Sequence, residues 1–275
     1  MVTLIAAMAL AQAQSQSPRS RVLVHNGAAQ IDVIVEGDGD AIVLLPSSQR
    51  GSEDFDDVAQ RLAAAGHRVL RPQPRGIGAS TGSLEGLTLH ALASDVAVTI
   101  RELGGGRAIV VGHAYGHYVA RVTDLDYPQL VRGVVMAASA SAGADPSLPK
   151  SLDIAADAGQ PEAERLHHLQ RAFFAPGSDA RPWLDGWHPE LAVAYRSAAK
   201  VPERGAWWTV AHAPVLDLQA ADDPWRPAAS RGEVTDALGD KASVVVIPGA
   251  SHALFPEQPA AVAKAIVAWA AGLPR

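Results

Sequence analysis

The sequence predicts an α/β fold in which a mostly parallel central sheet is covered by helices on both faces. Short apolar runs with the length of buried strands alternate with segments of helical periodicity from Ala41 to about Ala138. Alternation of this kind is typical of parallel strands joined by crossover helices. The same alternation resumes at Pro214 and continues almost to the end of the chain. The two halves therefore predict one sheet, and the segment between them predicts an insertion.

The individual elements follow from these patterns in chain order. An antiparallel hairpin at a sheet edge comes first, because β-rich runs at Arg21–Asn26 and Ile31–Glu36 flank Gly27. The expected strands after it are Ala41–Leu45, a strand beginning at Val69–Leu70, Ala108–Val111, Val131–Ala137, Pro214–Gln219 and Ser243–Ile247. The expected helices, each chosen for its periodicity or its flanking glycines, are Asp54–Ala65, Leu89–Leu103, Tyr115–Leu125, Glu233–Leu238 and Pro259–Ala271.

The insertion spans residues 139–213 and is named the cap segment below. It carries several prolines between short helical pieces and much of the chain's aromatic content, including Phe173, Phe174, Trp183 and Trp187. We expect a mostly helical cap over the carboxyl ends of the strands, where open α/β sheets bind their ligands. The predicted organisation is a core formed by residues 21–138 and 214–275, interrupted by the cap segment at residues 139–213.

Residues 1–20 differ in composition from the rest of the chain. An apolar run, Val2–Ala11, precedes the polar stretch Gln12–Ser20, and small residues at Ala9 and Ala11 match a processing site. This pattern predicts a secretory signal peptide followed by a flexible segment, and hence a periplasmic or secreted protein. No Lys or Arg precedes the apolar run, so a late start site or a retained helical arm stays open, with a cytoplasmic location. No other segment is apolar and long enough to span a bilayer.

Composition narrows the classes of function. Apolar residues make up 48% of the chain and charged residues 19%, as in globular proteins. The formal charge is −6 and Lys and Arg form no stripe, so nucleic acid is not an expected partner. The absence of cysteine excludes disulfides, zinc–thiolate sites and a thiol nucleophile. No cofactor is expected, since Arg75–Ser80 lacks the third glycine of a dinucleotide fingerprint.

The strand expected at Ala108–Val111 runs directly into the sequence Gly112-His113-Ala114-Tyr115-Gly116 and then into a helix. This is the frame of a nucleophile elbow, G-x-Nu-x-G, placed between a strand and a helix as the motif requires. The glycines permit a sharp turn and close packing, and the middle residue is presented to a pocket. Ala114 occupies that middle position. A methyl group cannot attack a carbonyl carbon, so Ala114 cannot form an acyl-enzyme.

With this elbow, the chain from about Ala41 to Ala271 resembles the α/β-hydrolase family, near its capped esterases, haloperoxidase-like enzymes and epoxide hydrolases. Arg75–Ser80 matches the family's R-G-x-G-x-S turn, and Ala220–Pro224 and Gly249–His252 follow the last two strands. The resemblance implies an α/β-hydrolase fold and the order nucleophile, acid, histidine.

The resemblance also implies the roles of individual residues. His252 aligns with the catalytic histidine and Asp223 with the acid, although the adjacent Asp222 could take that role. The backbone amides of Ser48 and Tyr115 align with the oxyanion hole, a role that tolerates most side chains. The first strand ends in Pro46-Ser47 where the family has His-Gly.

Four further residues are candidates for contact with a substrate. His113 and His117 flank the elbow, and Trp187 and Tyr195 lie in the cap segment. A histidine before the nucleophile commonly packs behind the elbow in this family, so structural use of His113 is favoured. A metal site formed by His113, His117 and His252 is not expected, because isolated histidines are weak metal signals. His117 could face either the pocket or the sheet.

Three hypotheses of function follow, all with a small, largely apolar molecule as partner. In the first, His252 acts as a general base without a serine, on water at an ester, lactone, amide or related carbonyl, or in a lyase or isomerase step. In the second, the chain is a serine esterase inactivated by an engineered Ser→Ala change at Ala114. In the third, it is a silent ligand-binding protein. Natural alanine and an engineered change both stay open, and no pattern specifies an oligomeric state.

Overall fold

The structure, a computed structural model, describes residues 19–274. It contains an eight-stranded sheet in the order β1-β2-β4-β3-β5-β6-β7-β8. The strands are β1 Ser20–Asn26, β2 Ala29–Glu36, β3 Asp40–Leu45, β4 His67–Pro72, β5 Ala108–His113, β6 Val131–Ala137, β7 Val215–Ala220 and β8 Ala242–Ile247. The strand β2 pairs antiparallel with both of its neighbours, and the remaining pairs are parallel. The mostly parallel sheet predicted from the sequence is confirmed. The predicted signal peptide lies outside the described residues, apart from Arg19 and Ser20.

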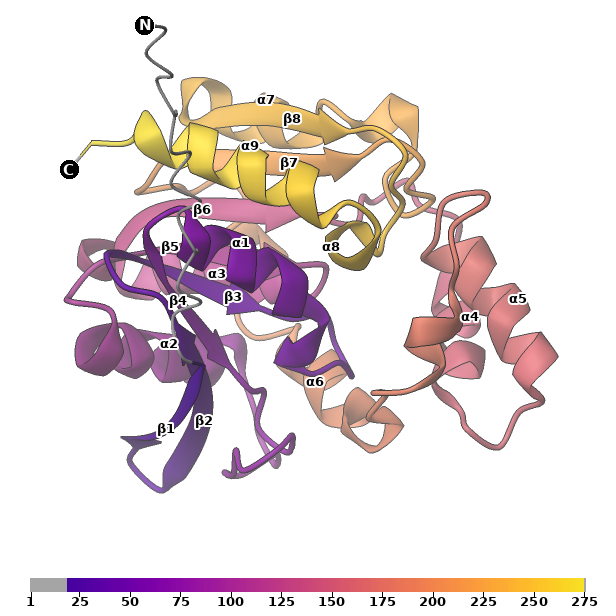
Figure 1. Ribbon diagram of the computed structural model, residues 1–275, viewed down its shortest axis with the longest axis horizontal. Helices are drawn as coiled ribbons and strands as arrows, with labels where there is room; N and C mark the ends of the chain where they lie inside the picture. The colour runs from indigo at the N-terminus through magenta and orange to yellow at the C-terminus, as the bar shows by residue number, and fades with distance from the viewer. Residues whose placement is uncertain (1–18, 275) are drawn as a thin grey trace, which may run out of the picture.

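Helices cover both faces of this sheet (Figure 1). The helices α1 Asp56–Ala64, α8 Leu254–Glu257 and α9 Pro259–Ala271 share one apolar cluster with the strands. The helices α2 Leu89–Leu103, α3 Gly116–Asp126 and α7 Glu233–Leu238 share the cluster on the opposite face. No helix among residues 19–274 is long and apolar enough to cross a membrane. The sheet is thus the middle of three layers, and its carboxyl edge stays open for the cap segment.

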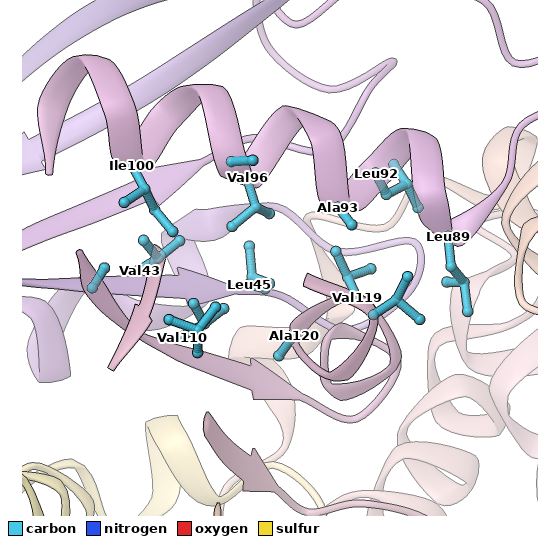
Figure 2. Close-up of a cluster of buried hydrophobic side chains, with 14 of the residues drawn as sticks. Val43, Leu45, Leu89, Leu92, Ala93, Val96, Ile100, Val110, Val119 and Ala120 are labelled. Carbon is cyan, nitrogen blue, oxygen red and sulfur yellow. The ribbon is translucent and has the colours of Figure 1, made fainter. Parts of the chain in front are cut away.

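The helix α2 illustrates how the sequence specifies this packing. Its buried apolar residues recur at helical spacing and point toward the sheet (Figure 2): Leu89, Leu92, Ala93, Val96 and Ile100. They pack on Val43, Leu45 and Val110 of the strands. Burial of each of the larger side chains contributes about 1.5–3 kcal/mol. The Thr88 side chain accepts a hydrogen bond from the Ala91 amide and so begins the helix.

The cap segment joins β6 to β7 and contains helices without strands. Its helices are α4 Leu148–Ala156, α5 Glu162–Ala172 and α6 Ala192–Ala198, with short 3₁₀ turns between them. Figure 1 shows α4 and α5 on the side to which the arrowheads of the parallel strands point. Phe173, Phe174 and Trp183 are buried in the cap segment's own apolar cluster, together with Ala253 from the core. The aromatic residues of this cluster therefore stabilise the cap segment and its seat on the sheet.

A buried arginine joins the cap segment to the loop after β3. The Arg50 guanidinium lies 4.4 Å from the Trp183 ring centroid and 4.7 Å from that of Trp187. It also donates to the Asp54 carboxylate at 2.8 Å and to the Asp185 carbonyl at 2.6 Å. Stacking of a desolvated guanidinium on indole rings is worth up to about 2 kcal/mol. Arg50 thereby holds this part of the cap segment against the loop that follows β3.

Two elements differ from the sequence prediction. The strand β5 extends two residues further than the apolar run, through Gly112 and His113, because these residues keep their pairing with β6. The strand β8 forms a sheet edge, and its Val244 and Val246 are 39% and 40% exposed, although an apolar run of this length resembles a buried strand.

Candidate active site

The elbow adopts its sharp turn with alanine at its tip. Ala114 directly follows β5 and has φ of +46°, in the left-handed region. Its amide donates to the Ala137 carbonyl at 2.9 Å, and its carbonyl accepts from the His117 amide at 3.0 Å. A non-glycine residue in this conformation costs roughly 1–2 kcal/mol. The chain thus keeps the strained conformation that presents a side chain to the pocket, although the side chain is only a methyl group.

The two elbow glycines are required by contacts between backbones. A Cβ atom on Gly112 would lie 2.2 Å from the Gly116 carbonyl oxygen. A Cβ atom on Gly116 would lie 2.3 Å from the Leu45 carbonyl oxygen. Neither backbone can yield by the displacement of a flexible side chain, so any larger residue at these positions forces β3, β5 and α3 apart. The G-x-x-x-G spacing is therefore a packing requirement in this chain.

His252 and Asp223 meet beside the elbow. The Nδ1 atom of His252 lies 3.1 and 3.0 Å from the two carboxylate oxygens of Asp223. Both side chains are buried, whereas Asp222 is exposed. The geometry therefore selects Asp223 over Asp222 as the partner of the histidine. Because Nδ1 faces a carboxylate it carries the proton, and Nε2 is left as the basic nitrogen.

Hydrogen bonds from several elements position this pair. The Trp225 amide donates to Asp223 at 2.8 Å. On the histidine side, Glu257 accepts from the Ser251 amide at 2.7 Å, and His113 Nε2 donates to the His252 carbonyl at 2.7 Å. These hydrogen bonds therefore fix the loop that carries Asp223 and the loop that carries His252.

A buried ion pair lies beneath the loop that follows β7 and carries Asp223, called the acid loop below. The Nη2 atom of Arg226 lies 2.8 Å from Asp217 on β7, with side-chain exposures of 1% and 0%. Arg226 also donates to the Ser139 hydroxyl at 3.1 Å, and its amide donates to the Asp223 carbonyl at 3.1 Å. Burial raises the pKa of Asp217, while the Arg226 charge acts in the opposite direction. The acid loop is thereby anchored to the sheet and to the start of the cap segment.

A cavity of about 330 Å³ opens in front of Ala114 and is called the large cavity below. The core contributes Ser47, Ser48, Gln49, Ala114, Tyr115, His117, Tyr118, Trp225 and His252 to its wall. The cap segment contributes Ala140, Pro149, Leu152, Ala192, Arg196 and Ala199. The cavity therefore lies between the carboxyl edge of the sheet and the cap segment. It brings together Ala114, His252 and the residues whose amides the resemblance singled out.

The amides of Ser48 and Tyr115 have no acceptor among the protein groups of residues 19–274. Ser48 precedes Gln49, which has φ of +63° and accepts a hydrogen bond from the His188 amide of the cap segment at 2.9 Å. Tyr115 opens α3, where the first amides have no intrahelical partner. Both N–H groups are therefore free to bind an acceptor from outside the protein.

The structure distributes the four substrate-contact candidates differently from the sequence expectation. His117 lines the large cavity, and its Nδ1 donates to the Ala114 carbonyl. Burial lowers the pKa of His117 to about 3, so this imidazole is neutral. The other candidates, His113, Trp187 and Tyr195, do not line the large cavity.

Each of these three side chains has another use. His113 lies behind the elbow against Phe55 and Phe255, and burial lowers its pKa to about 3. Trp187 stacks on Arg50, and the Tyr195 hydroxyl donates to the Arg75 carbonyl at 3.1 Å. His113 and Trp187 therefore make structural contacts outside the large cavity, while Tyr195 lines a neighbouring cavity.

Other wall residues carry no sequence motif. Trp225 lies near His252, with ring centroids 5.2 Å apart. The sequence signal that could have pointed to it as a wall residue is its position two residues after Asp223. Ala192, Arg196 and Ala199 share one face of α6 at helical spacing, but spacing alone does not tell which face meets the pocket. Within residues 19–274 no three His, Asp or Glu side chains are grouped to hold a metal ion.

Comparison with known proteins places this site in a family. Residues 42–265 match the model of the "Alpha/beta hydrolase family". A curated relative, 2-(acetamidomethylene)succinate hydrolase of Mesorhizobium japonicum, is 27% identical over 276 residues, covering 88% of this chain and 92% of the relative.

Two solved structures share the fold. E-2-(acetamidomethylene)succinate hydrolase superposes with a TM-score of 0.76 at 21% identity, over 93% of this chain and 100% of the other. A thermophilic esterase from Thermogutta terrifontis superposes with a TM-score of 0.73 at 20% identity, over 93% and 98%. At these identities the structures show the fold alone, but the family match spans most of the chain. Because the family model covers residues 42–265, the motif-based resemblance is confirmed, and the chain belongs to the alpha/beta hydrolase family.

Proposed function

We propose that this protein hydrolyses a small carbonyl compound, such as an ester, lactone or amide, by direct attack of water that His252 activates. One observation carries the proposal. His252, whose Nδ1 is paired with Asp223, lines a cavity together with Ser48 and Tyr115, two residues whose amides have no acceptor in the described part of the chain. The residue at the elbow of the same cavity, Ala114, has no nucleophilic atom. Because Ala114 has no hydroxyl group, His252 takes the proton from a water molecule instead, and no covalent enzyme intermediate forms.

The proposed reaction needs no group from outside the chain except water. Asp223 holds the Nδ1 proton and stabilises the imidazolium as His252 Nε2 takes a proton from water. The resulting hydroxide bonds to the carbonyl carbon, and the carbonyl electron pair moves to oxygen, where the amides of Ser48 and Tyr115 donate hydrogen bonds. When the tetrahedral intermediate collapses, the bond to the leaving nitrogen or oxygen breaks and His252 returns its proton to that atom. The products are a carboxylic acid and an amine or alcohol.

Two features support the proposed substrate class. The cap segment lines the large cavity mostly with apolar groups, among them Pro149, Leu152, Ala192 and Ala199, which suits a small, largely apolar molecule. The curated relative that spans most of the chain is named as a hydrolase of an acetamido compound, so amides belong in the assay panel beside esters and lactones.

The test is hydrolysis of a panel of small esters, lactones and amides, followed by product analysis. We expect turnover by the protein and a loss of about 10²–10⁴-fold in kcat/KM for His252→Ala, the usual contribution of a positioned base. Asp223→Asn should lower the rate as well. The exposed His167→Ala serves as the matched control and should retain the parent rate. Ligand binding without turnover would favour a silent binding protein, and product formation unaffected by His252→Ala would exclude the proposed base.

We also propose that residues 1–20 direct export. The support is the composition of the segment, an apolar run followed by small and polar residues. Protein isolated from a native envelope fraction should begin near Gln12 or Gln14, as read by intact-mass analysis. Met1 retained on envelope material would contradict the proposal.

A further inference from the structure

A second cavity lies directly beside the large one and is called the small cavity below. Its volume is about 50 Å³, counted as the space that the centre of a water molecule can occupy. Ser47, Gln49 and Tyr115 line both cavities. Nothing in the reaction described above uses this space. It adjoins Tyr115, whose amide is one of the two free amides, and so lies next to the place where a molecule at the elbow would bind.

The wall of the small cavity is largely apolar. It is formed by side chains from the sheet, the helices α2 and α3 and the cap segment: Ile31, Leu45, Leu92, Val96, Val119 and Leu191. Three polar side chains of the wall, Arg75, Asp95 and Tyr195, already have partners within the protein. Arg75 pairs with Asp95 at 2.7 Å, and the Tyr195 hydroxyl donates to the Arg75 carbonyl at 3.1 Å. A hydrocarbon group placed here would therefore lose water without stripping a partner from these three side chains.

Tyr115 is the common wall between the two cavities. Its ring packs edge-on against Tyr195 and Tyr118, with centroids 5.6 Å apart in each case. Its hydroxyl is buried without a hydrogen-bond partner in the described part of the chain. Tyr115 is also one of the two residues whose amides we assign to the oxyanion. A carbonyl bound to that amide therefore has the small cavity on the other side of the same residue.

We infer that the small cavity binds a short apolar substituent on the carbonyl carbon of the substrate, which enters it beside Tyr115, Ser47 and Gln49, the residues that line both cavities. At about 50 Å³ the small cavity suits a short substituent of a few non-hydrogen atoms. The inference rests on the proposed function for the placement of the carbonyl. It narrows the substrate class to short-chain acyl compounds.

The absence of cysteine allows a direct test without background labelling. Val119→Cys places one thiol in the wall of the small cavity, and Val122→Cys places one in the packed core beneath the same helix, at a residue that lines neither the small nor the large cavity. Val119 and Val122 are both buried, at 7% and 0% exposure. Methyl methanethiosulfonate is the probe: the thiolate attacks its sulfenyl sulfur, a mixed disulfide forms and methanesulfinate leaves. Intact-mass analysis measures the rate.

We expect Val119→Cys in the folded protein to react at least tenfold faster than Val122→Cys. Butyrate should slow the reaction of Val119→Cys more than acetate does. Each added methylene should lower the Kd of the carboxylate about fourfold, the factor that corresponds to burial of one CH₂ group at ~0.8 kcal/mol. Thermal unfolding curves confirm that both variants are folded. Equal, slow labelling of the two variants would overturn the inference, as would protection that does not depend on chain length.

This result is independent of catalysis. Labelling and protection without any hydrolysis would leave the small cavity established and the proposed function refuted. Hydrolysis that depends on His252, without labelling of Val119→Cys, would support the proposed function and refute the role of the small cavity in it.

Discussion

Replacement of Arg226 by methionine should cost a large part of the protein's stability, because it leaves a carboxylate buried without its partner. Arg226 and Asp217 are 2.8 Å apart and almost completely buried. Removal of one member of a buried ion pair typically costs about 3–5 kcal/mol. The remaining donor to the Asp217 carboxylate with a short contact is Gln219 Nε2, at 2.7 Å, which does not neutralise the charge. We therefore expect Arg226→Met to lower the free energy of unfolding by about 3–5 kcal/mol at pH 7.

The loss should depend on pH in a defined direction. Burial already raises the pKa of Asp217, and the nearby Arg226 charge lowers it, so the Arg226→Met change raises this pKa further. An acid whose folded pKa lies above its unfolded value binds protons more strongly in the folded state. Its destabilising effect therefore grows as pH rises above the unfolded pKa and is relieved as pH falls. The difference in unfolding free energy between Arg226→Met and the parent should shrink from pH 7 toward pH 5.

Urea unfolding followed by tryptophan fluorescence at both pH values measures this difference. The double variant Arg226→Met with Asp217→Leu is the matched control, because a well-packed apolar pair of similar volume is often as stable as the buried ion pair. The double variant should recover most of the lost stability at pH 7. An equal loss for Arg226→Met at both pH values, or a double variant no more stable than the single one, would refute the reasoning.

Two further predictions concern the elbow and the buried histidines. Gly116→Ala should lower the free energy of unfolding by ~3 kcal/mol or more, since its Cβ would lie 2.3 Å from the Leu45 oxygen, whereas Gly205→Ala, with open space around it, should change stability little in urea titrations. Burial lowers the pKa of His113 to about 3, so the unfolded state gains a proton first and stability falls as pH drops from about 6.5 toward about 3. His113→Gln, which keeps a donor for the His252 carbonyl, should lessen this fall by ~1.4 kcal/mol per pH unit; an unchanged slope between pH 6 and pH 5 would contradict the prediction.

The parts of the fold that could be predicted are those with local sequence signals. The strands β3, β6 and β7 are short and mostly apolar, although β6 includes Arg132 and β7 includes Asp217 and Gln219. The elbow is marked by Gly112 and Gly116 between a strand and a helix. The family match and the sheet order bear out this level of the prediction. The pairing of His252 with Asp223 followed from the loops after the last two strands, because the ends of parallel strands meet at one edge of the sheet.

The remaining parts depend on contacts between distant segments. Nothing near Arg50 in the sequence indicates that it stacks on Trp183 and Trp187, which come from the cap segment. For the same reason Trp187 seemed available to a ligand although its ring was already used by the protein. The choice between Asp222 and Asp223 required the register of β7. The small cavity beside Tyr115 arises where strands, the helices α2 and α3 and the cap segment fail to fill the space between them. These features are set by tertiary packing, which leaves no periodic trace in the sequence.

The central claim is that this site holds a working base, acid and oxyanion donors and lacks only a nucleophile, and restoring a serine at the elbow tests it most directly. Ala114→Ser, treated with a fluorophosphonate ester that reacts with activated serines, should become labelled, and mass spectrometry should locate the adduct at position 114. The parent protein should stay unlabelled, and His252→Ala in the Ala114→Ser background should abolish labelling. A folded Ala114→Ser variant that stays unlabelled would contradict the claim and show that His252, Asp223 and the two amides do not form a site competent for attack on an acyl or phosphoryl centre.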